Sequence, residues 1–254
     1  MKKNFIDIYL LLTSESTLHM REPIWVFVGI FEPLTYLLLF APFLNGVKTM
    51  PGFPSENVIQ FFAPGLLIMT ALFGASYVGF GLLDKVESGV LERYRVTPIS
   101  RLSLVLGYLL ENALVLLVQS FILLVCSLFF GLQFHLLGLI LLFILVLLIG
   151  IVMSSASCAL SLILKDGGIL ASVINFVILP VYILSGIMLP LKFAPSVIQT
   201  VALFNPFYYA VTASRSLIDG IIIEPSVFAG FGLFAVLAVF SLIWFIKIMQ
   251  DTVS

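Results

Sequence analysis

Six long apolar runs dominate this chain of 254 residues and limit what it can fold into. A helix needs about 20 predominantly apolar residues to cross the hydrocarbon core of a bilayer. Each run is long enough, and continuous runs favour helices, because the strands of a membrane barrel show about ten residues of alternating hydrophobicity instead. The sequence therefore predicts an all-α polytopic membrane protein with six spans, at residues 24–44, 61–83, 102–130, 136–164, 169–189 and 227–246.

The composition agrees with a membrane protein. Hydrophobic residues make up 61% of the chain and charged residues 10%, whereas soluble domains are about one quarter charged. A water-soluble fold of this length cannot hide so much apolar surface. The 12 Lys and Arg residues are scattered and form no nucleic-acid-binding patch. With no internal repeat, residues 1–254 are expected to form a single transmembrane domain.

The distribution of Lys and Arg predicts which side of the membrane the termini face. Six spans place both termini on one side, and short cytoplasmic loops are enriched in Lys and Arg. We therefore expect both termini, and the loop at residues 84–101, in the cytoplasm. With that orientation nine basic residues are inside and three are outside, namely Lys2, Lys3, Arg21, Lys85, Arg93, Arg95, Arg101, Lys165 and Lys247 against Lys48, Lys192 and Arg215.

Two segments outside the spans have patterns of their own. Apolar residues in 4–22 fall near helical spacing, which is typical of an amphipathic helix lying in the membrane interface; a slightly longer first span is the alternative. The segment 190–225 is apolar but interrupted by four prolines, and no part of it is long enough to cross. Two short helices that enter the outer leaflet and return fit it, provided that protein covers their ends.

Signals for an enzyme are absent. The chain has no Gly-Lys dipeptide, and therefore no phosphate-binding P-loop. His19 and His135 are the only histidines, and both lie outside the spans. The sequence thus predicts no catalytic residue, no metal site and no cofactor on this chain.

Two carboxylates lie within the spans and are candidate functional residues, because an ionised acid in lipid costs several kcal/mol unless it is paired or wet. Glu32 precedes Pro33 near the middle of the first run and could face a transport pathway or a dimer seam. A protonated or hydrogen-bonded structural role is the alternative. Glu111, about ten residues into the third run, is the second candidate, with a structural pairing to Arg101 or Lys165 as the favoured reading.

The one well-charged break between the runs, residues 84–101, reads DKVESGVLERYRVTPISR. Such a loop is a candidate docking site for a soluble partner, with a solvated turn as the alternative. It contains the pattern E-x-G-x-L-E-R-x-x-x-T-P, formed by Glu87, Gly89, Leu91, Glu92, Arg93, Thr97 and Pro98. This pattern resembles the cytoplasmic loop of the ABC-2 type permeases, the membrane subunits of ATP-binding-cassette exporters.

The resemblance continues in order along the chain. Ala63-Pro64-Gly65 at the start of the second span is similar to the family pattern, as is Ser185-Gly186. The stretch APGLLIMTALF is most similar to the daunorubicin-type drug-resistance permeases. By the same resemblance the segment 190–225 is an outer re-entrant helical hairpin. Because Arg215 would be costly in lipid alone, it is expected to reach Asp219, the outer interface or a lipid headgroup. The residues of that hairpin that match are Pro190, Asn205, Pro206 and Arg215.

The resemblance implies a half-transporter in the cytoplasmic membrane of a prokaryote. Two permease chains, as a homodimer or as a heterodimer with a paralogue, pair with two copies of a separate ABC ATPase subunit. ATP and Mg²⁺ bind to that ATPase, and the charged loop forms a coupling helix that docks in a groove on it. No nucleic acid is expected as a partner.

The substrate implied is an amphipathic drug, peptide or lipid-like molecule, so that multidrug efflux and antibiotic resistance are expected roles. Within the same family, export of a lipid-linked glycan or cell-wall polymer is the alternative. A non-transporting membrane protein, such as an immunity or sensor subunit, is an alternative from another class.

Overall fold

The computed structural model describes residues 12–13, 24–40, 58–90, 93, 100–188 and 190–253, which form helices, turns and bends without a strand. The predicted all-helical class is thus confirmed for this part of the chain. Apart from residues 12–13, the interfacial helix predicted at 4–22 lies outside the described residues. The helices in chain order are α2 (Ile24–Thr35), η1 (Tyr36–Phe40), α4 (Val58–Ser76), α5 (Val78–Glu87), α7 (Arg101–Phe129), α8 (Leu136–Leu164), α9 (Gly167–Ile183), η2 (Leu191–Phe193), α10 (Ser196–Ala202), α11 (Pro206–Ile218) and α12 (Pro225–Val253).

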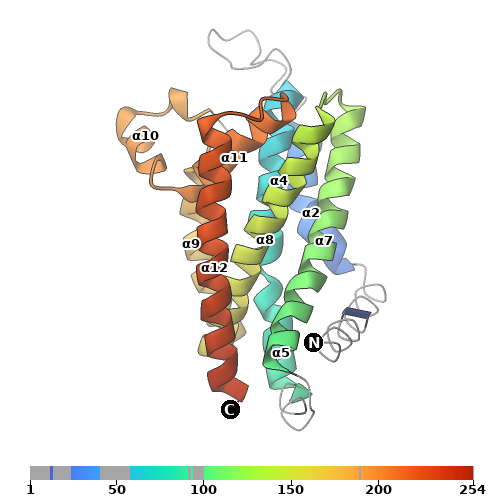
Figure 1. Cartoon of the computed structure of the whole chain (residues 1–254), viewed down its shortest axis with the longest axis vertical. Coiled ribbons are helices and arrows are strands. Elements are labelled where there is room, and N and C mark those ends of the chain that lie inside the picture. The colour runs from blue at the N-terminus through green and yellow to red at the C-terminus, as the bar shows by residue number, and fades with distance from the viewer. Residues whose placement is uncertain are drawn as a thin grey trace.

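Four helical segments are long and apolar enough to cross a membrane, namely Val58–Glu87, Ser103–Phe129, Leu136–Leu164 and Pro225–Asp251. The first segment comprises α4 and α5, and the other three are α7, α8 and α12. These helices pack into one bundle (Figure 1). Two shorter apolar helices, Gly29–Leu39 and Gly167–Ile183, stand where the first and fifth spans were expected. The chain is therefore a multi-pass membrane protein, while the count of six spans stays a prediction.

The central helix is α8, which contacts α4, α5, α7, α9, α11 and α12. Its sequence is apolar on all sides, as expected for a helix surrounded by other helices and lipid. Small residues let its neighbours approach closely. A Cβ added at Gly138 would collide with the Leu217 carbonyl of α11, and one added at Gly150 would collide with Leu116 of α7.

Two helices differ in extent from the apolar runs that predicted them. The second run, expected as one helix over 61–83, is interrupted at Tyr77, and α5 then continues to Glu87. The fifth run, expected over 169–189, ends as a helix at Ile183. It ends there because Gly186 has φ +76° in the turn that follows, a left-handed conformation that glycine adopts without steric cost.

The bundle has two distinct ends (Figure 1). At one end, which we call the loop end, lie the last residues of α5 and α12. At the opposite end lie α10, α11 and the start of α4. We call this second region the cap, and define it as residues 190–224 together with the first turn of α4 and the turn at 130–135. The cap lies where the outer segment was expected.

Candidate functional site

The loop end carries the described part of the predicted coupling loop. α5 ends at Glu87, whose side chain is exposed, and the Gly89 N–H donates to the Val86 carbonyl (3.1 Å). Gly89 has φ +70°, which ends the helix in the way that favours glycine. Arg93 is also exposed, and its N–H donates to the Gly89 carbonyl (3.3 Å). The other predicted coupling residues lie outside the described residues, namely Leu91, Glu92, Thr97 and Pro98.

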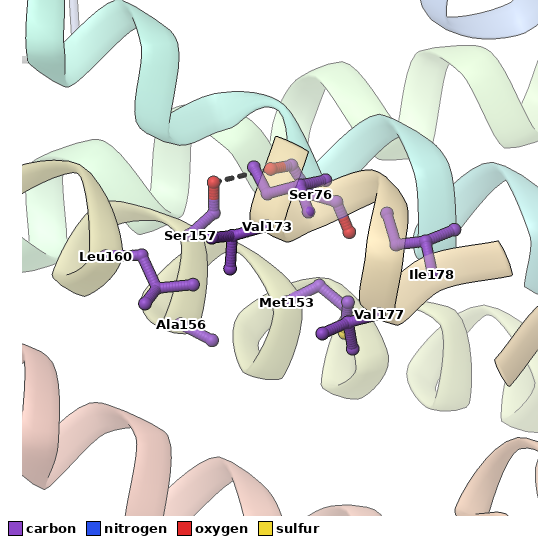
Figure 2. Close-up of a pocket in the computed structure, with 9 residues that line it drawn as sticks. Ser76, Met153, Ala156, Ser157, Leu160, Val173, Val177 and Ile178 are labelled. Carbon is purple, nitrogen blue, oxygen red and sulfur yellow. Dashed lines mark hydrogen bonds between the residues drawn. The ribbon is translucent and has the colours of Figure 1, made fainter. Parts of the chain in front are cut away.

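One serine of α8 holds both sides of the break between α4 and α5, and we call this arrangement the Ser157 clamp. The Ser157 hydroxyl donates to the Ser76 carbonyl at the end of α4, as Figure 2 shows, and accepts from the Gly79 N–H in α5 (3.0 Å). α5 can lie this close to α8 because Gly79 has no side chain; an added Cβ would collide with the backbone and hydroxyl of Ser157. The loop end is thereby linked to α4 and α8 through one hydroxyl group.

A crevice of about 100 Å³ opens beside the clamp, between α8 and α9 (Figure 2). Sites for drug-sized ligands are larger, about 300–1,000 Å³. The crevice is therefore a gap in the packing of α9 on α8 and not a site for such a ligand. Its lining is apolar except for two serines, and comprises Ser76, Met153, Ala156, Ser157, Leu160, Val173, Ile174, Val177 and Ile178.

Glu32 lies on an exposed part of α2, in the middle of the continuous helical stretch that α2 forms with η1. The Tyr77 hydroxyl, at the α4–α5 break, donates to Asn175 Oδ1 of α9 (2.9 Å). We call the exposed surface of α2 around Glu32 the Glu32 face.

Glu111 lies in a different environment. Its side chain is buried on α7, one turn after Tyr108, whose ring lies under the Lys85 ammonium of α5 (4.3 Å from Nζ to the ring centroid). Both Lys85 and Glu111 act electrostatically on the buried thiol of Cys158 in α8. Glu111 thus belongs to the interface of α5, α7 and α8, and the structure does not bring it together with Glu32.

Arg215 joins two parts of the cap to the turn after α9. From α11 its Nε donates to the Phe61 carbonyl of α4 (3.1 Å), and its Nη2 donates to the Gly186 carbonyl (2.8 Å) and more weakly to that of Ile187 (3.4 Å). The guanidinium also lies 3.6 Å from the centroid of the Phe61 ring, a favourable cation–π distance. Burial lowers the pKa of Arg215 to about 9, so the group is still charged at neutral pH.

These contacts differ from the expectation for Arg215. The sequence suggested Asp219, the outer interface or a lipid headgroup as its partner, but the guanidinium donates to backbone carbonyls. Two of them, at Gly186 and Ile187, belong to the turn after α9. Non-helical backbone at the membrane needs protein donors and acceptors, and Arg215 supplies the donors. Asp219 instead accepts from Gln60 Nε2 of α4 (2.9 Å).

Asn205 and Pro206 mark the start of α11. The Asn205 side chain caps the helix, its Oδ1 accepting from the Phe207 N–H (3.0 Å), and Pro206 occupies the first turn, where a missing N–H costs nothing. The Asn205 Nδ2 also donates to the Val181 carbonyl of α9 (2.7 Å). Pro190 is buried and begins η2, where its carbonyl accepts from the Phe193 N–H (3.1 Å). Whether α10 and α11 form a re-entrant hairpin in a membrane stays a prediction.

Several polar residues that organise the molecule were not singled out from the sequence. Gln60 Nε2 donates to the Gln133 carbonyl (2.9 Å) and its Oε1 accepts from the Gln133 N–H (3.1 Å), so α4 is fixed to the turn before α8. The available signal was position: Gln60 lies at the edge of an apolar run and Asn175 inside one. In the part of the chain that the structure describes, no cluster of His, Cys, Asp and Glu could hold a metal ion.

Comparison with known proteins decides the family. The family model described as ABC-2 type transporter matches residues 7–218. The chain belongs to the ABC-2 type transporter family. It is 31% identical over 201 residues to a protein of Cyanophora paradoxa named as transport permease ycf38, an overlap of 78% of this chain and 69% of that one.

Two more distant relatives have names of different kinds. The daunorubicin resistance ABC transporter permease protein DrrB1 of Streptomyces coeruleorubidus is 24% identical over 78% of this chain and 70% of its own length. Nodulation protein J of Azorhizobium caulinodans is 25% identical over 75% of this chain and 74% of its own. The ABC-2 family membership predicted from the loop motif and the outer segment is therefore confirmed, and the chain is a membrane permease of this family.

Proposed function

We propose that the chain is the transmembrane permease subunit of an ATP-driven exporter and that two copies of it work with two copies of a separate ABC ATPase. The family match supports a transport role. The absence of a Gly-Lys dipeptide from all 254 residues supports the division of labour, because a P-loop lysine is then missing from this chain. ATP and Mg²⁺ would bind to the partner ATPase.

The single observation that carries the coupling role is the short helix α5. It ends in exposed Glu87 at the loop end and is joined to α4 and α8 through the Ser157 clamp. A push on the loop by a closing ATPase pair would move α5 and, through the clamp, the helices behind it. Such rigid-body movement between two packed arrangements is a general route for switching. The coupling residues proposed are Glu87, Gly89, Leu91, Glu92, Arg93, Thr97 and Pro98.

The proposed orientation places the loop end in the cytoplasm of a prokaryotic cell. Described basic residues at this end include Lys85, Arg93, Lys165 and Lys247, as the positive-inside rule requires. A single cysteine placed in the segment 45–57 should react with a membrane-impermeant thiol reagent added to whole cells. Reaction only after the cells are opened would reverse the orientation.

The substrate proposed is an amphipathic, drug-like, peptide or lipid-like molecule. The name of the Streptomyces relative, which refers to daunorubicin resistance, supports the drug class. Efflux of amphipathic dyes from cells that express the permease with its ATPase would test this class. Loss of efflux when only the ATPase is inactivated is the expected result.

The ATPase partnership is tested by a tagged pull-down of the full chain from native membranes, with ATP turnover assayed on the eluate. We expect a P-loop ATPase to co-elute and to give vanadate-sensitive turnover. Replacing Glu87 with Ala should weaken this association about tenfold, or about 1.4 kcal/mol. Asp84→Ala is the matched control, because Asp84 is an exposed acid one turn earlier on α5.

Two results would contradict the proposal. A chain that elutes alone in mild detergent, in repeated preparations, would remove the ATPase partner and favour a non-transporting membrane protein. Equal association of wild type, Glu87→Ala and Asp84→Ala would leave the partner in place but remove Glu87 from the docking surface.

A further inference from the structure

The helix α9 (Gly167–Ile183) is held to the bundle by little apolar packing. Phe176 in this helix is 81% exposed. The crevice beside the Ser157 clamp separates part of α9 from α8 (Figure 2). The position of α9 therefore depends strongly on the hydrogen bonds that it makes with other segments. Only four of its 17 residues are buried in the described chain, namely Leu170, Ile174, Ile178 and Tyr182.

One of these bonds starts from the residue at which the second run is interrupted. Tyr77 lies between α4 and α5 with φ −94° and ψ 0°, and its carbonyl accepts from the Phe80 N–H (3.1 Å). Its hydroxyl donates to Asn175 Oδ1, in the middle of α9 (2.9 Å). The Asn175 Nδ2 donates to the Ala171 carbonyl of the same helix (2.9 Å), which fixes the direction of Oδ1. Because the phenol belongs to the break itself, a change in the bend there moves the phenol and pulls on α9.

The outer end of α9 is fixed to the cap. The Val181 carbonyl accepts from Asn205 Nδ2 (2.7 Å). In the turn that follows α9, the Gly186 carbonyl accepts from Arg215 Nη2 (2.8 Å). Asn175 and Val181 are about 9 Å apart along the helix axis, at a rise of about 1.5 Å per residue. A helical segment this short moves as one body, so a shift at Asn175 reaches the cap.

The fixed side of this arrangement is α8, the central helix of the bundle. Besides α9 it contacts α4, α5, α7, α11 and α12. The Ser157 clamp holds the break to α8 through the Ser76 carbonyl and the Gly79 N–H. When the break moves relative to α8, the more exposed helix α9 is the neighbour that can follow it. Packed elements of this kind switch between discrete arrangements.

We propose that the Tyr77–Asn175 hydrogen bond couples the α4–α5 break to the cap. A movement of α5 is passed by Tyr77 to α9, and by α9 through Val181 and Gly186 to the cap. Tyr77 and Asn175 are thus positioning residues that act through α9. The inference rests on the proposed export function for its purpose, since an ATPase that docks at the loop end reaches the outer end of the protein by this route.

The test is a mutant cycle on the full chain in nanodiscs, without any ATPase. Ser157→Ala loosens the break, and hydrogen exchange with peptide mass analysis reports the effect at the Gly79 amide and at the cap. The cap readout is the Ile187 N–H, which donates to Ser185 Oγ in the turn after α9 (3.2 Å). With the Tyr77 hydroxyl present, we expect Ser157→Ala to speed exchange of Ile187 about fivefold or more. In a Tyr77→Phe chain the same change should leave Ile187 within about twofold and still speed Gly79, because α9 is then not tied to the break.

Two further variants complete the cycle. Asn175→Leu removes the acceptor of the same bond and should give the same result as Tyr77→Phe, so either variant tests the proposal if the other fails to fold. Ser172→Ala is the matched control. Its hydroxyl donates to the Gly168 carbonyl within α9 (2.8 Å), so its loss removes a side-chain hydrogen bond of α9 that does not reach the break. In a Ser172→Ala chain the response of Ile187 to Ser157→Ala should be retained.

The proposal is overturned if Ser157→Ala speeds exchange of Ile187 equally with and without the Tyr77 hydroxyl, or changes it in neither chain. It also fails if Ser172→Ala abolishes the response, because α9 as a whole and not the hydrogen bond would then carry it. An unchanged Gly79 amide in Ser157→Ala contradicts it as well, since the break would not be held at α8. None of these results needs an ATPase. A chain that shows the coupling but has no ATPase partner loses the export function alone, and an exporter without the coupling loses this inference alone.

Discussion

The cap and the Glu32 face treat polar side chains in opposite ways. In the cap, Arg215, Asn205 and Gln60 are each satisfied by groups of the protein, and each joins two or more segments. On the Glu32 face, the acid is exposed, and within the described part of the chain it makes no hydrogen bond or ion pair. Buried polar groups that are fully hydrogen-bonded fix one arrangement. An exposed acid without such bonds does not fix an arrangement of helices.

The difference between the two regions shows what the residues of 186–215 that match the family pattern do. Asn205, Pro206 and Arg215 lie on α11 or at its start, and Gly186 lies in the turn that Arg215 contacts; each completes a helix end or a turn. Their roles are therefore structural. Glu32 makes no such contact in the described chain, and its place in a transport pathway or a dimer seam stays a prediction.

The largest loss of stability is expected from Arg215→Ala. It removes two short hydrogen bonds from a charged donor, and since such bonds contribute about 1.5–3 kcal/mol each, the loss of stability should be about 3–6 kcal/mol. Arg215→Lys should retain only part of the stability that Arg215→Ala loses, because an ammonium lacks the planar fork that reaches both Phe61 and Gly186. Thermal unfolding is followed with a thiol-reactive dye in a Cys126→Ser background, because Cys126 is already partly exposed; the dye then reports the exposure of the fully buried Cys158.

The matched control for Arg215 is Lys192→Ala, an exposed basic residue in the same segment of the chain. It removes the same charge without removing a buried hydrogen bond, so its unfolding midpoint should stay near that of wild type. If Arg215→Ala unfolds at the same temperature as Lys192→Ala, the cap does not depend on Arg215.

A smaller loss of stability is expected from Asn205→Ala. The substitution removes the cap of α11 together with the hydrogen bond to Val181, and loss of a helix cap costs about 1–2 kcal/mol. Asn205→Ser separates the two contacts, because serine caps a helix well but is too short to reach α9. The same thiol-dye assay should place the serine variant between wild type and Asn205→Ala. A serine variant as unstable as the alanine variant would mean that the link to α9 carries the whole effect.

Some of these features followed from the sequence and others did not, for physical reasons. The bounds of α8 equal the apolar run at 136–164, because a helix surrounded by helices and lipid is apolar on every side. The break at Tyr77 lies within a run that is apolar throughout, so hydropathy gave no sign of it. The partners of Arg215 are backbone carbonyls, one of them 154 residues away along the chain, and a carbonyl has no signature in a sequence.

The serines of α8 show the same limit. Ser154 donates to the Gly150 carbonyl in its own helix (2.6 Å), whereas Ser157 bridges to α4 and α5. Both belong to one small-residue cluster, and nothing in their spacing separates the two roles. Only the position of the α4–α5 break, which depends on tertiary packing, decides which serine becomes the clamp.

Ser157→Ala should lower stability by about 1 kcal/mol, the usual net value of a buried hydrogen bond, and should speed hydrogen exchange at the Gly79 amide. The control is Ser155→Ala in the same helix. Ser155 Oγ is buried and, within the described part of the chain, has no hydrogen-bond partner, so its removal should be neutral or slightly stabilising. Equal exchange at Gly79 in both variants would mean that the clamp does not hold the break, and would weaken the proposed route from the loop end to α4.

The smallest change in stability is expected from Glu32→Gln. A residue that makes no hydrogen bond or ion pair within the described part of the chain should alter the free energy of unfolding by no more than about 0.5 kcal/mol when its charge is removed. The thiol-dye assay used for Arg215→Ala measures this directly. A loss as large as that of Asn205→Ala would support the structural role that the sequence left open for Glu32, and the contrast with the cap would disappear. Normal stability would leave the transport pathway and the dimer seam as its predicted places, because a structural role for the carboxylate has to appear in the free energy of unfolding.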